Sequence, residues 1–175
     1  AVIGRELKNP LLDAWMLGFR QRFGNRVIPK AGGARGTLKA FRQGDGVGYL
    51  LDQDALGMGI FVTFLGRWVS TFSSAGAMAV RFDLPILPVF SWPEGEGRLR
   101  IRFEAPFHVP RTGDEARDTW VATQRMTSCI EAQVRKDPRL WFWMHNRFKT
   151  QPGQPGSPEL PPVAWTEGFE VPSRL

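Results

Sequence analysis

The stretch G-V-G-Y-L-L-D-Q-D-A-L-G-M-G-I-F-V-T-F, residues 46–64, decides the fold class. It holds two apolar runs, Gly46–Leu51 and Ile60–Phe64, on either side of an acidic segment and a glycine-rich turn. A continuous apolar run of strand length between turn residues is typical of a strand buried in a mainly parallel sheet. We therefore expect both runs to be strands, the first of them buried, with Asp52 just beyond its carboxyl end.

Helical patterns flank these strands. Asn9 and Pro10 supply a capping side chain and a first-turn residue for a helix whose apolar positions recur at helical spacing until Gly24. The other expected helices cover residues 34–43, 70–81 and 114–136. The other expected strands cover residues 25–28, 85–90 and 99–103, and the strand over residues 85–90 is expected to be buried. In the last strand apolar residues alternate with arginines, which predicts one wet face. Because strands and helices alternate, we expect an α/β fold with a mixed, mainly parallel sheet flanked by helices.

The composition is that of one folded domain. The 175 residues are 42% hydrophobic and 12% aromatic, which supplies a core and excludes disorder over most of the length. We expect one domain over residues 1–150 and an irregular, Pro-rich tail over residues 151–175. No apolar run approaches the about 20 residues that a membrane span needs, so any membrane attachment of this segment is expected to be peripheral.

Cysteine and histidine are scarce. Cys129 is the only cysteine, which excludes an internal disulfide and a cysteine-ligated zinc site, and two histidines are too few for a multi-histidine metal centre. We therefore expect neither a metal nor a cofactor. Cys129 lies within an expected helix, where a buried, inert thiol is the better interpretation.

The net charge is +6 and it is unevenly distributed. Residues 1–49 contain nine basic and three acidic side chains, whereas the rest of the chain carries equal numbers of each sign. Such a basic segment favours an anionic partner: a phospholipid surface, a phosphorylated glycolipid or nucleic acid. No nucleic-acid-binding motif accompanies the charge, whereas an anionic lipid needs none, so nucleic acid is the least favoured of the three.

Several polar residues are candidates for chemistry. Asp52 lies where α/β sheets line their ligand crevice, and a turn cap is the alternative role for it. Asp54 adds weak support for a metal. His108 and His145 offer general bases, but neither has a supporting pattern, and a structural role is the alternative for both.

The aromatic segment Trp141–Lys149 has two interpretations. Its tryptophans pack in a core, or they form an interfacial belt in which Arg147 and Lys149 meet lipid phosphates. The pattern alone favours packing for Trp141 and Trp143.

A set of motifs follows one order along nearly the whole chain. They are Asn9-Pro10-Leu11-Leu12-Asp13 with Arg20-x-Arg22, Gly46–Leu51 with Asp52-Gln53-Asp54, Ile60-Phe61-Val62-x-Phe64-Leu65-Gly66, Leu84-Pro85-Ile86-Leu87-Pro88-Val89-Phe90, Pro138-x-x-x-Trp141-x-Trp143-x-His145-x-Arg147-Phe148-Lys149-Thr150 and Val171-Pro172-Ser173-Arg174. In this order they resemble the carboxy-terminal part of the lipid A biosynthesis acyltransferases, the late lauroyl and myristoyl transferases of bacterial endotoxin assembly. The Trp-x-Trp-x-His-x-Arg-Phe-Lys segment is the most specific of them.

The resemblance implies a glycerolipid-acyltransferase-like α/β fold. It also implies transfer of a fatty acyl chain from acyl carrier protein to a hydroxyl of a lipid A precursor or a related glycolipid. In that family a His-x4-Asp/Glu motif supplies the general base and the carboxylate that orients it. Neither histidine of this chain fits, because His108 is followed five positions on by Gly113 and His145 by Thr150. The family's motif lies upstream of the segment that matches Asn9–Asp13, so we expect a fragment that lacks its catalytic dyad and its amino-terminal anchor and is inactive alone.

Two family positions of active-site importance carry over, to Arg20 and Asp52. The resemblance implies that Arg20, with Arg22, grips a phosphate of the glycolipid or of the acyl carrier's phosphopantetheine. It implies that Asp52 holds Arg20 or bonds substrate hydroxyls, and an ordinary structural ion pair of the two is the alternative. Arg147 and Lys149 are further candidates for binding the anionic substrate.

The resemblance places the activity at the cytoplasmic face of a bacterial inner membrane, with a peripheral attachment for this segment. The expected partners are acyl carrier protein as acyl donor, an anionic glycolipid acceptor and the membrane surface, and not nucleic acid. The alternative function is a non-catalytic module that binds anionic lipid through the basic first third of the chain and residues 141–149.

Overall fold

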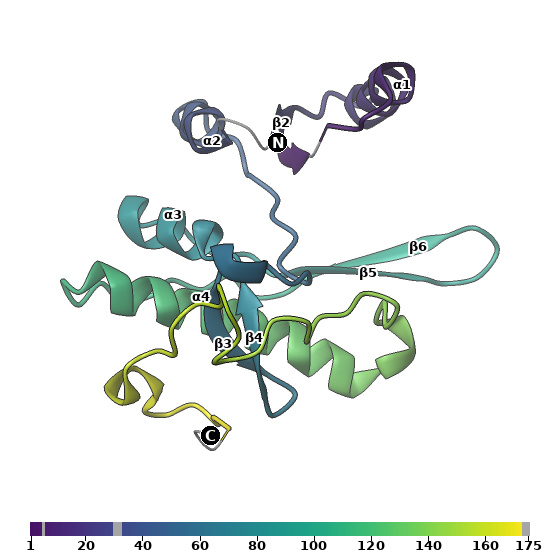
Figure 1. Cartoon of the computed structure of the whole chain (residues 1–175). Coiled ribbons are helices and arrows are strands. Elements are labelled where there is room, and N and C mark those ends of the chain that lie inside the picture. The colour runs from purple at the N-terminus through teal and green to yellow at the C-terminus, as the bar shows by residue number, and fades with distance from the viewer. Residues whose placement is uncertain (5, 30–32, 173–175) are drawn as a thin grey trace. The chain divides into compact units, whose positions relative to one another are not determined.

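The computed structural model describes residues 1–4, 6–29 and 33–172 (Figure 1). The chain divides into two compact units, Ala1–Leu50 and Leu51–Leu175, and each is described by itself. The expected boundary near residue 150 stays a prediction. All of the excess positive charge falls in the first unit.

The first unit pairs β1 (Val2–Gly4) in parallel with β2 (Val27–Pro29), and α1 (Pro10–Gln21) connects them. The predicted start of α1 is confirmed, since the side-chain oxygen of Asn9 accepts hydrogen bonds from the N–H groups of Leu11 and Leu12 at 3.0 and 3.2 Å. None of the residues of α1 is buried, although its sequence has an apolar face.

The rest of the first unit differs from the expected pattern. The helix α2 (Gly33–Arg42) matches its prediction and buries Thr37 and Ala40. The expected buried strand Gly46–Leu51 does not form; Gly48 makes an isolated parallel bridge with Val2, and Leu50 is 77% exposed.

In the second unit a short 3-10 helix, η1 (Leu56–Met58), precedes an antiparallel hairpin of β3 (Ile60–Phe64) and β4 (Arg67–Thr71). The prediction of β3 is confirmed. Leu65 and Gly66 connect the strands with φ angles of 50° and 73°, the two left-handed conformations that a two-residue type I′ turn requires.

The strand β4 occupies residues that were expected to begin a helix. That helix, α3 (Ser74–Phe82), starts later than the predicted residues 70–71. Val69, Ser70 and Thr71 are buried and pair with β3. Val69 and Thr71 are β-branched and favour a strand, and pairing with β3 places Ser70 in the strand with them.

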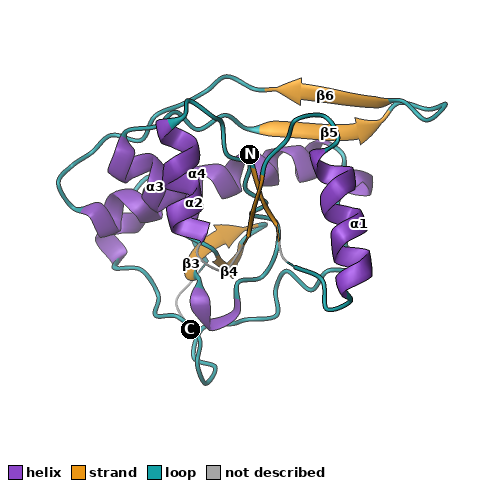
Figure 2. Cartoon of the chain, turned by 90° about the horizontal axis from the view of Figure 1, so that it is seen from above, coloured by secondary structure: helices purple, strands orange, loops and turns teal. Residues whose placement is uncertain are grey.

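The long helix α4 (Glu115–Lys136) is confirmed, with Asp114 as its N-cap. It packs on α3, beside which it lies in both views (Figures 1 and 2). Gly76 marks the close approach, because a Cβ there would lie 2.7 Å from Oγ1 of Thr123 and 3.0 Å from the carbonyl oxygen of Thr119.

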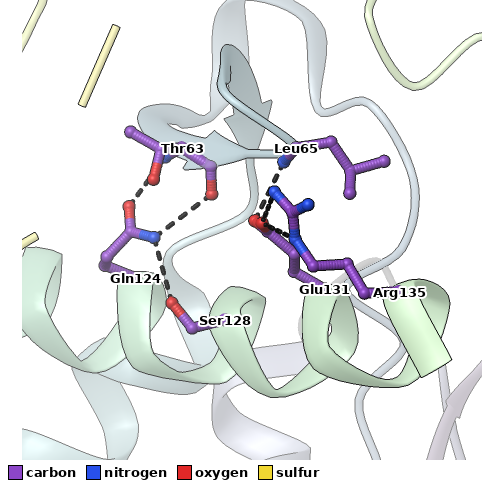
Figure 3. A network of polar contacts seen from close by, with 6 residues as sticks. All are labelled: Thr63, Leu65, Gln124, Ser128, Glu131 and Arg135. Carbon is purple, nitrogen blue, oxygen red and sulfur yellow. Dashed lines mark hydrogen bonds and ion pairs between the residues drawn. The ribbon is translucent and has the colours of Figure 1, made fainter. Parts of the chain in front are cut away.

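Side chains of α4 bind the edge of β3 that β4 leaves open (Figure 3). Gln124 accepts from the N–H of Thr63 at 2.7 Å and donates to its carbonyl oxygen at 3.1 Å. Glu131 accepts from the N–H of Leu65 at 2.9 Å and pairs with Arg135 at 2.7 Å. The helix thus satisfies backbone groups that a further strand would otherwise bind.

The core of the second unit lies around this hairpin and α4. Trp120 is buried and donates from Nε1 to the carbonyl oxygen of Phe61 at 2.8 Å. The buried members of this hydrophobic cluster are Val62, Phe64, Val69, Trp120 and Val134. The tail contributes to this core: it forms a short 3-10 helix, η3 (Val163–Thr166), and the ring of Phe169 packs edge-on against Trp120 at 5.4 Å.

The strands β5 (Val89–Pro93) and β6 (Leu99–Phe103) form an antiparallel ribbon that extends away from β3, β4 and α4 (Figure 1). The prediction of β6 is confirmed, but its apolar residues are exposed. The expected buried strand Pro85–Phe90 is wrong, since β5 begins only at Val89 and is not buried. Pro85 and Pro88 have no N–H to donate to a ladder, which limits pairing here to a bridge between Ile86 and Phe107.

The mixed α/β class is therefore confirmed, and the expected mainly parallel sheet is not found. Within the described residues the pairs β3–β4 and β5–β6 are antiparallel, and only β1–β2 is parallel. The reason is local: short turns join each antiparallel pair, whereas the segment expected as the buried parallel strand makes a single bridge.

Candidate functional site

The loop Asp52-Gln53-Asp54 is held by the segment that follows α4. The N–H of Asp54 donates to Nε2 of His145 at 2.9 Å. The Asp54 carboxylate accepts from the N–H and the hydroxyl of Thr150 at 3.1 and 2.8 Å. It also accepts from the N–H of Leu56 at 2.9 Å. Asp54 thus has a structural role that joins two motifs far apart in the sequence.

Arg147 lies beneath this loop and is 2% exposed. It donates to the carbonyl oxygens of Gln53 and Ser70 at 2.9 and 2.5 Å, and to the hydroxyl of Thr71. Burial lowers its pKa to about 10, an effect that the carboxylates of Asp54 and Asp52 partly offset. The guanidinium therefore remains charged at neutral pH and ties the acidic loop to β4.

One carboxylate oxygen of Asp52 accepts no hydrogen bond from the described residues. The residue is partly buried, and its Oδ1 is shielded from solvent without a hydrogen-bond partner among the described residues. A buried acceptor without a donor is costly, and such groups are rare in folded proteins. A substrate hydroxyl or a guanidinium would supply the missing donor, so Asp52 is the strongest candidate for ligand contact in this unit.

The structure tests only the packing interpretation of the aromatic segment. Packing is confirmed for Trp141, whose ring lies 5.2 Å from that of Phe64. Trp143 is 54% exposed and donates from Nε1 to the carbonyl oxygen of Pro138 at 2.7 Å. Lys149 is exposed, so its ammonium group is accessible to an anion.

The predicted arginines lie at the end of α1 in the first unit. Arg20 is exposed, and its Nη1 lies 3.1 Å from where a Cβ on Gly4 would be. Arg22 is placed over the rings of Phe23 and Phe19 at 4.7 and 5.6 Å. Because Arg20 and Asp52 belong to different units, their ion pair stays a prediction.

Within residues 1–4, 6–29 and 33–172, neither histidine forms an enclosed base–carboxylate pair. His145 uses the lone pair of Nε2 to accept from Asp54, which is a structural role. Nδ1 of His108 lies 3.5 Å from Oδ1 of Asp83, and both side chains are largely exposed. Within the described residues, no group of three His, Cys, Asp or Glu side chains is placed to hold a metal ion.

A separate cavity of about 660 Å³ opens where the start of α4, β3 and the tail meet. Its lining is mostly apolar, with Glu115 and Glu159 as its charged groups. The tail residues Leu160 and Trp165 line it, so the packing of the tail creates this cavity. Asp52, Arg147 and Lys149 belong to the second unit but do not line this cavity. Arg20 and Arg22 lie in the first unit.

Sequence reasoning missed the structural use of the acidic loop. Asp54, His145, Arg147 and Thr150 belong to motifs of the sequence, but nothing in the sequence indicates that the last three hold the loop of residues 52–54. The role of Gln124 was missed as well. Its only signal is a polar side chain on the apolar face of α4.

No helix among the described residues combines the length and the apolar character needed to cross a bilayer.

Comparisons with known proteins agree with these motifs. The model of the bacterial lipid A biosynthesis acyltransferase family matches residues 1–150. The chain therefore belongs to this family of acyltransferases.

Individual relatives support this assignment. The chain is similar to a lipid A biosynthesis acyltransferase of Haemophilus influenzae, with 26% identity over 82% of this chain and 44% of the relative. It is similar to the lipid A biosynthesis lauroyltransferase of Escherichia coli K12, with 25% identity over 82% of this chain and 46% of the relative. It is also similar to the lipid A biosynthesis myristoyltransferase of the same organism, with 29% identity over 83% of this chain and 45% of the relative. The chain spans about half the length of the curated relatives it matches.

Proposed function

We propose that this chain is the part of a lipid A-type acyltransferase that follows the catalytic dyad. The enzyme transfers a fatty acyl chain from acyl carrier protein to a hydroxyl of a lipid A precursor or a related glycolipid. The family match and the ordered motifs support the acyltransferase. The missing His-x4-Asp/Glu motif, together with coverage of about half of each relative, supports a longer protein in which residues before Ala1 supply the dyad.

The reaction needs a base, because a sugar hydroxyl is a poor nucleophile until its proton is removed. The dyad histidine takes that proton, and the hydroxyl oxygen attacks the thioester carbonyl carbon. The new C–O ester bond forms, the C–S bond breaks, and the carrier thiol leaves with the proton that the histidine returns. In this proposal Asp52 accepts a hydrogen bond from a substrate hydroxyl or from Arg20, and Arg20 and Arg22 bind a phosphate.

Arg147 and Lys149 differ in burial, and we assign them different roles. Lys149 is exposed and binds substrate phosphate in this proposal. Arg147 has its guanidinium engaged by Gln53, Ser70 and Thr71. We therefore assign Arg147 to positioning Asp52 and not to direct substrate contact.

At the level of single residues, one observation carries the proposal. The chain belongs to the acyltransferase family, and Oδ1 of Asp52 is shielded from solvent and accepts no hydrogen bond from the described residues. The test is acyl transfer from labelled acyl carrier protein to lipid A precursor by the protein extended upstream of Ala1. Asp52→Ala and Arg20→Ala should abolish transfer while the protein stays folded. Asp83→Ala, at an exposed carboxylate, is the matched control and should retain transfer. Transfer at the wild-type rate by both site variants would remove Asp52 and Arg20 from the active site.

The fragment proposal has its own test, the coding sequence immediately upstream of Ala1. We expect an open reading frame that encodes His-x4-Asp/Glu and, before it, an apolar helix. An in-frame stop followed by a start codon would contradict the proposal. The protein would act at the cytoplasmic face of the inner membrane, to which this segment attaches peripherally.

A second candidate is a non-catalytic module that binds anionic lipid. The exposed apolar residues of α1 in the basic unit favour it. Flotation of the 175-residue chain with anionic vesicles tests it, and failure to float at low salt would count against it.

A further inference from the structure

The helix α1 exposes an apolar face. Leu11, Leu12, Trp15 and Phe19 share one side of the helix by their spacing, and they are 82%, 48%, 63% and 54% exposed. The rings of Trp15 and Phe19 stack with their centroids 5.9 Å apart. Phe23, just after the helix, is 80% exposed. Large exposed apolar surfaces of this kind mark interaction sites.

Basic groups lie at the border of this face. The guanidinium of Arg22 lies over the rings of Phe23 and Phe19, so one cation sits directly beside the aromatic side chains. Arg20 and Lys8 are exposed near the two ends of α1. The unit that contains α1 carries the whole net charge of +6.

A second exposed apolar face, on the ribbon β5–β6, has a different charge environment. Leu99, Ile101 and Phe103 are 68%, 57% and 64% exposed. The neighbouring arginines are already paired with carboxylates, in the pairs Arg98–Glu96, Arg100–Glu94 and Arg102–Glu104. Apolar exposure is therefore common to both faces, and a basic border distinguishes α1.

We propose that the exposed face of α1 lies in the interface of an anionic bilayer, with Trp15 and Phe19 among the acyl chains and Arg22 at the phosphates. A helix with Trp, Phe and Leu on one face and basic residues at its border binds such a surface through buried apolar area and electrostatic attraction together. The inference deepens the membrane partner proposed above, and it does not depend on acyl transfer.

The experiment is co-flotation of the 175-residue chain with vesicles of phosphatidylcholine containing phosphatidylglycerol, which hold no acyl donor or acceptor. We expect binding to anionic vesicles that weakens with salt and with loss of phosphatidylglycerol. Trp15→Ser with Phe19→Ser should reduce the partition coefficient roughly tenfold or more, because each side chain loses its transfer into the interface. Arg22→Gln should reduce it by roughly fivefold on anionic vesicles only. Brominated acyl chains should quench the tryptophan fluorescence of the wild type more than that of the Trp15→Phe variant.

The control is Leu99→Ser with Phe103→Ser, which removes apolar side chains of similar exposure from the ribbon and should leave binding unchanged. Equal binding by the α1 and ribbon variants would overturn the proposal. It would also be overturned if the α1 variant lowered the unfolding midpoint strongly or dissociated a dimer in solution. Those results would show that the rest of the protein or a second copy covers the face. Acyl-transfer activity does not enter these readouts, so the failure of the proposed enzyme function would be seen separately.

Discussion

The side-chain amide of Gln124 binds both backbone groups of Thr63, accepting from its N–H at 2.7 Å and donating to its carbonyl oxygen at 3.1 Å. Gln124 is 1% exposed, so water does not compete for these bonds. An amide reproduces the donor and acceptor of a peptide group, and a helix side chain here takes the place of a neighbouring strand (Figure 3).

Replacing Gln124 by Leu should destabilise the protein more than its change in volume suggests. The variant leaves the N–H and the carbonyl oxygen of Thr63 buried without partners, which costs about 2–4 kcal/mol of unfolding free energy in denaturant titrations. The control is Ser128→Ala, since Ser128 is exposed and only accepts from the same amide at 3.3 Å. A loss for Gln124→Leu no larger than for the control would show that the edge of β3 does not need the amide.

The packing of α3 on α4 predicts opposite effects for two Gly→Ala changes in helices. Gly76→Ala places a methyl group 2.7 Å from Oγ1 of Thr123 and 3.0 Å from the carbonyl oxygen of Thr119, so it should cost about 1–3 kcal/mol. Gly18→Ala in α1 meets no atom within 4 Å and should stabilise its helix by about 0.5–1 kcal/mol. Thermal unfolding of both variants checks this. A neutral Gly76→Ala would mean that the two helices can separate without cost.

The thiol of Cys129 should react slowly. Burial raises its pKa, an effect that Arg125 opposes and Glu104 reinforces. Less thiolate is therefore present at pH 8 than for a free cysteine. The rate of reaction with a disulfide reagent should be below that of glutathione, with a pH midpoint above the ordinary value of about 8.5. Unfolding in guanidinium should restore the ordinary rate, and a fast native reaction would contradict this account.

Local signals in the sequence predicted the starts of α1 and α4. The start of α1 depends on the Asn9 side chain and its own next turn, and the same is true of Asp114 at the start of α4. These contacts span a few residues, so a sequence shows them directly.

Non-local contacts explain most of what the sequence did not show. The apolar run Gly46–Leu51 is suited to a buried strand, but a strand forms only where a partner pairs with it, and β1 meets this run at Gly48 alone. Conversely, Val69, Ser70 and Thr71 become a strand because β3 is adjacent. For the candidate site, residue types were identified, but the bonds of Arg147 to Gln53 depend on packing between distant segments.

Arg147 should be among the residues whose loss most destabilises the second unit. Arg147→Met removes the donors to Gln53 and Ser70 and leaves the carboxylates of Asp52 and Asp54 without their nearest buried cation. We expect a loss of about 3–5 kcal/mol in unfolding free energy, and a smaller loss for Arg147→Lys, which keeps the charge without the fork of donors.

The charge part of this effect can be separated from the loss of donors. Adding Asp52→Asn to Arg147→Met removes one of the uncompensated carboxylates, so the double variant should recover part of the lost stability. Arg139→Met is the matched control, since Arg139 forms an exposed ion pair with Asp137 and its loss should have little effect. If Arg147→Met unfolded at the same denaturant concentration as Arg139→Met, Arg147 would not hold the acidic loop on β4. The positioning of Asp52 would then have to come from the contacts of Asp54 with Thr150 and His145.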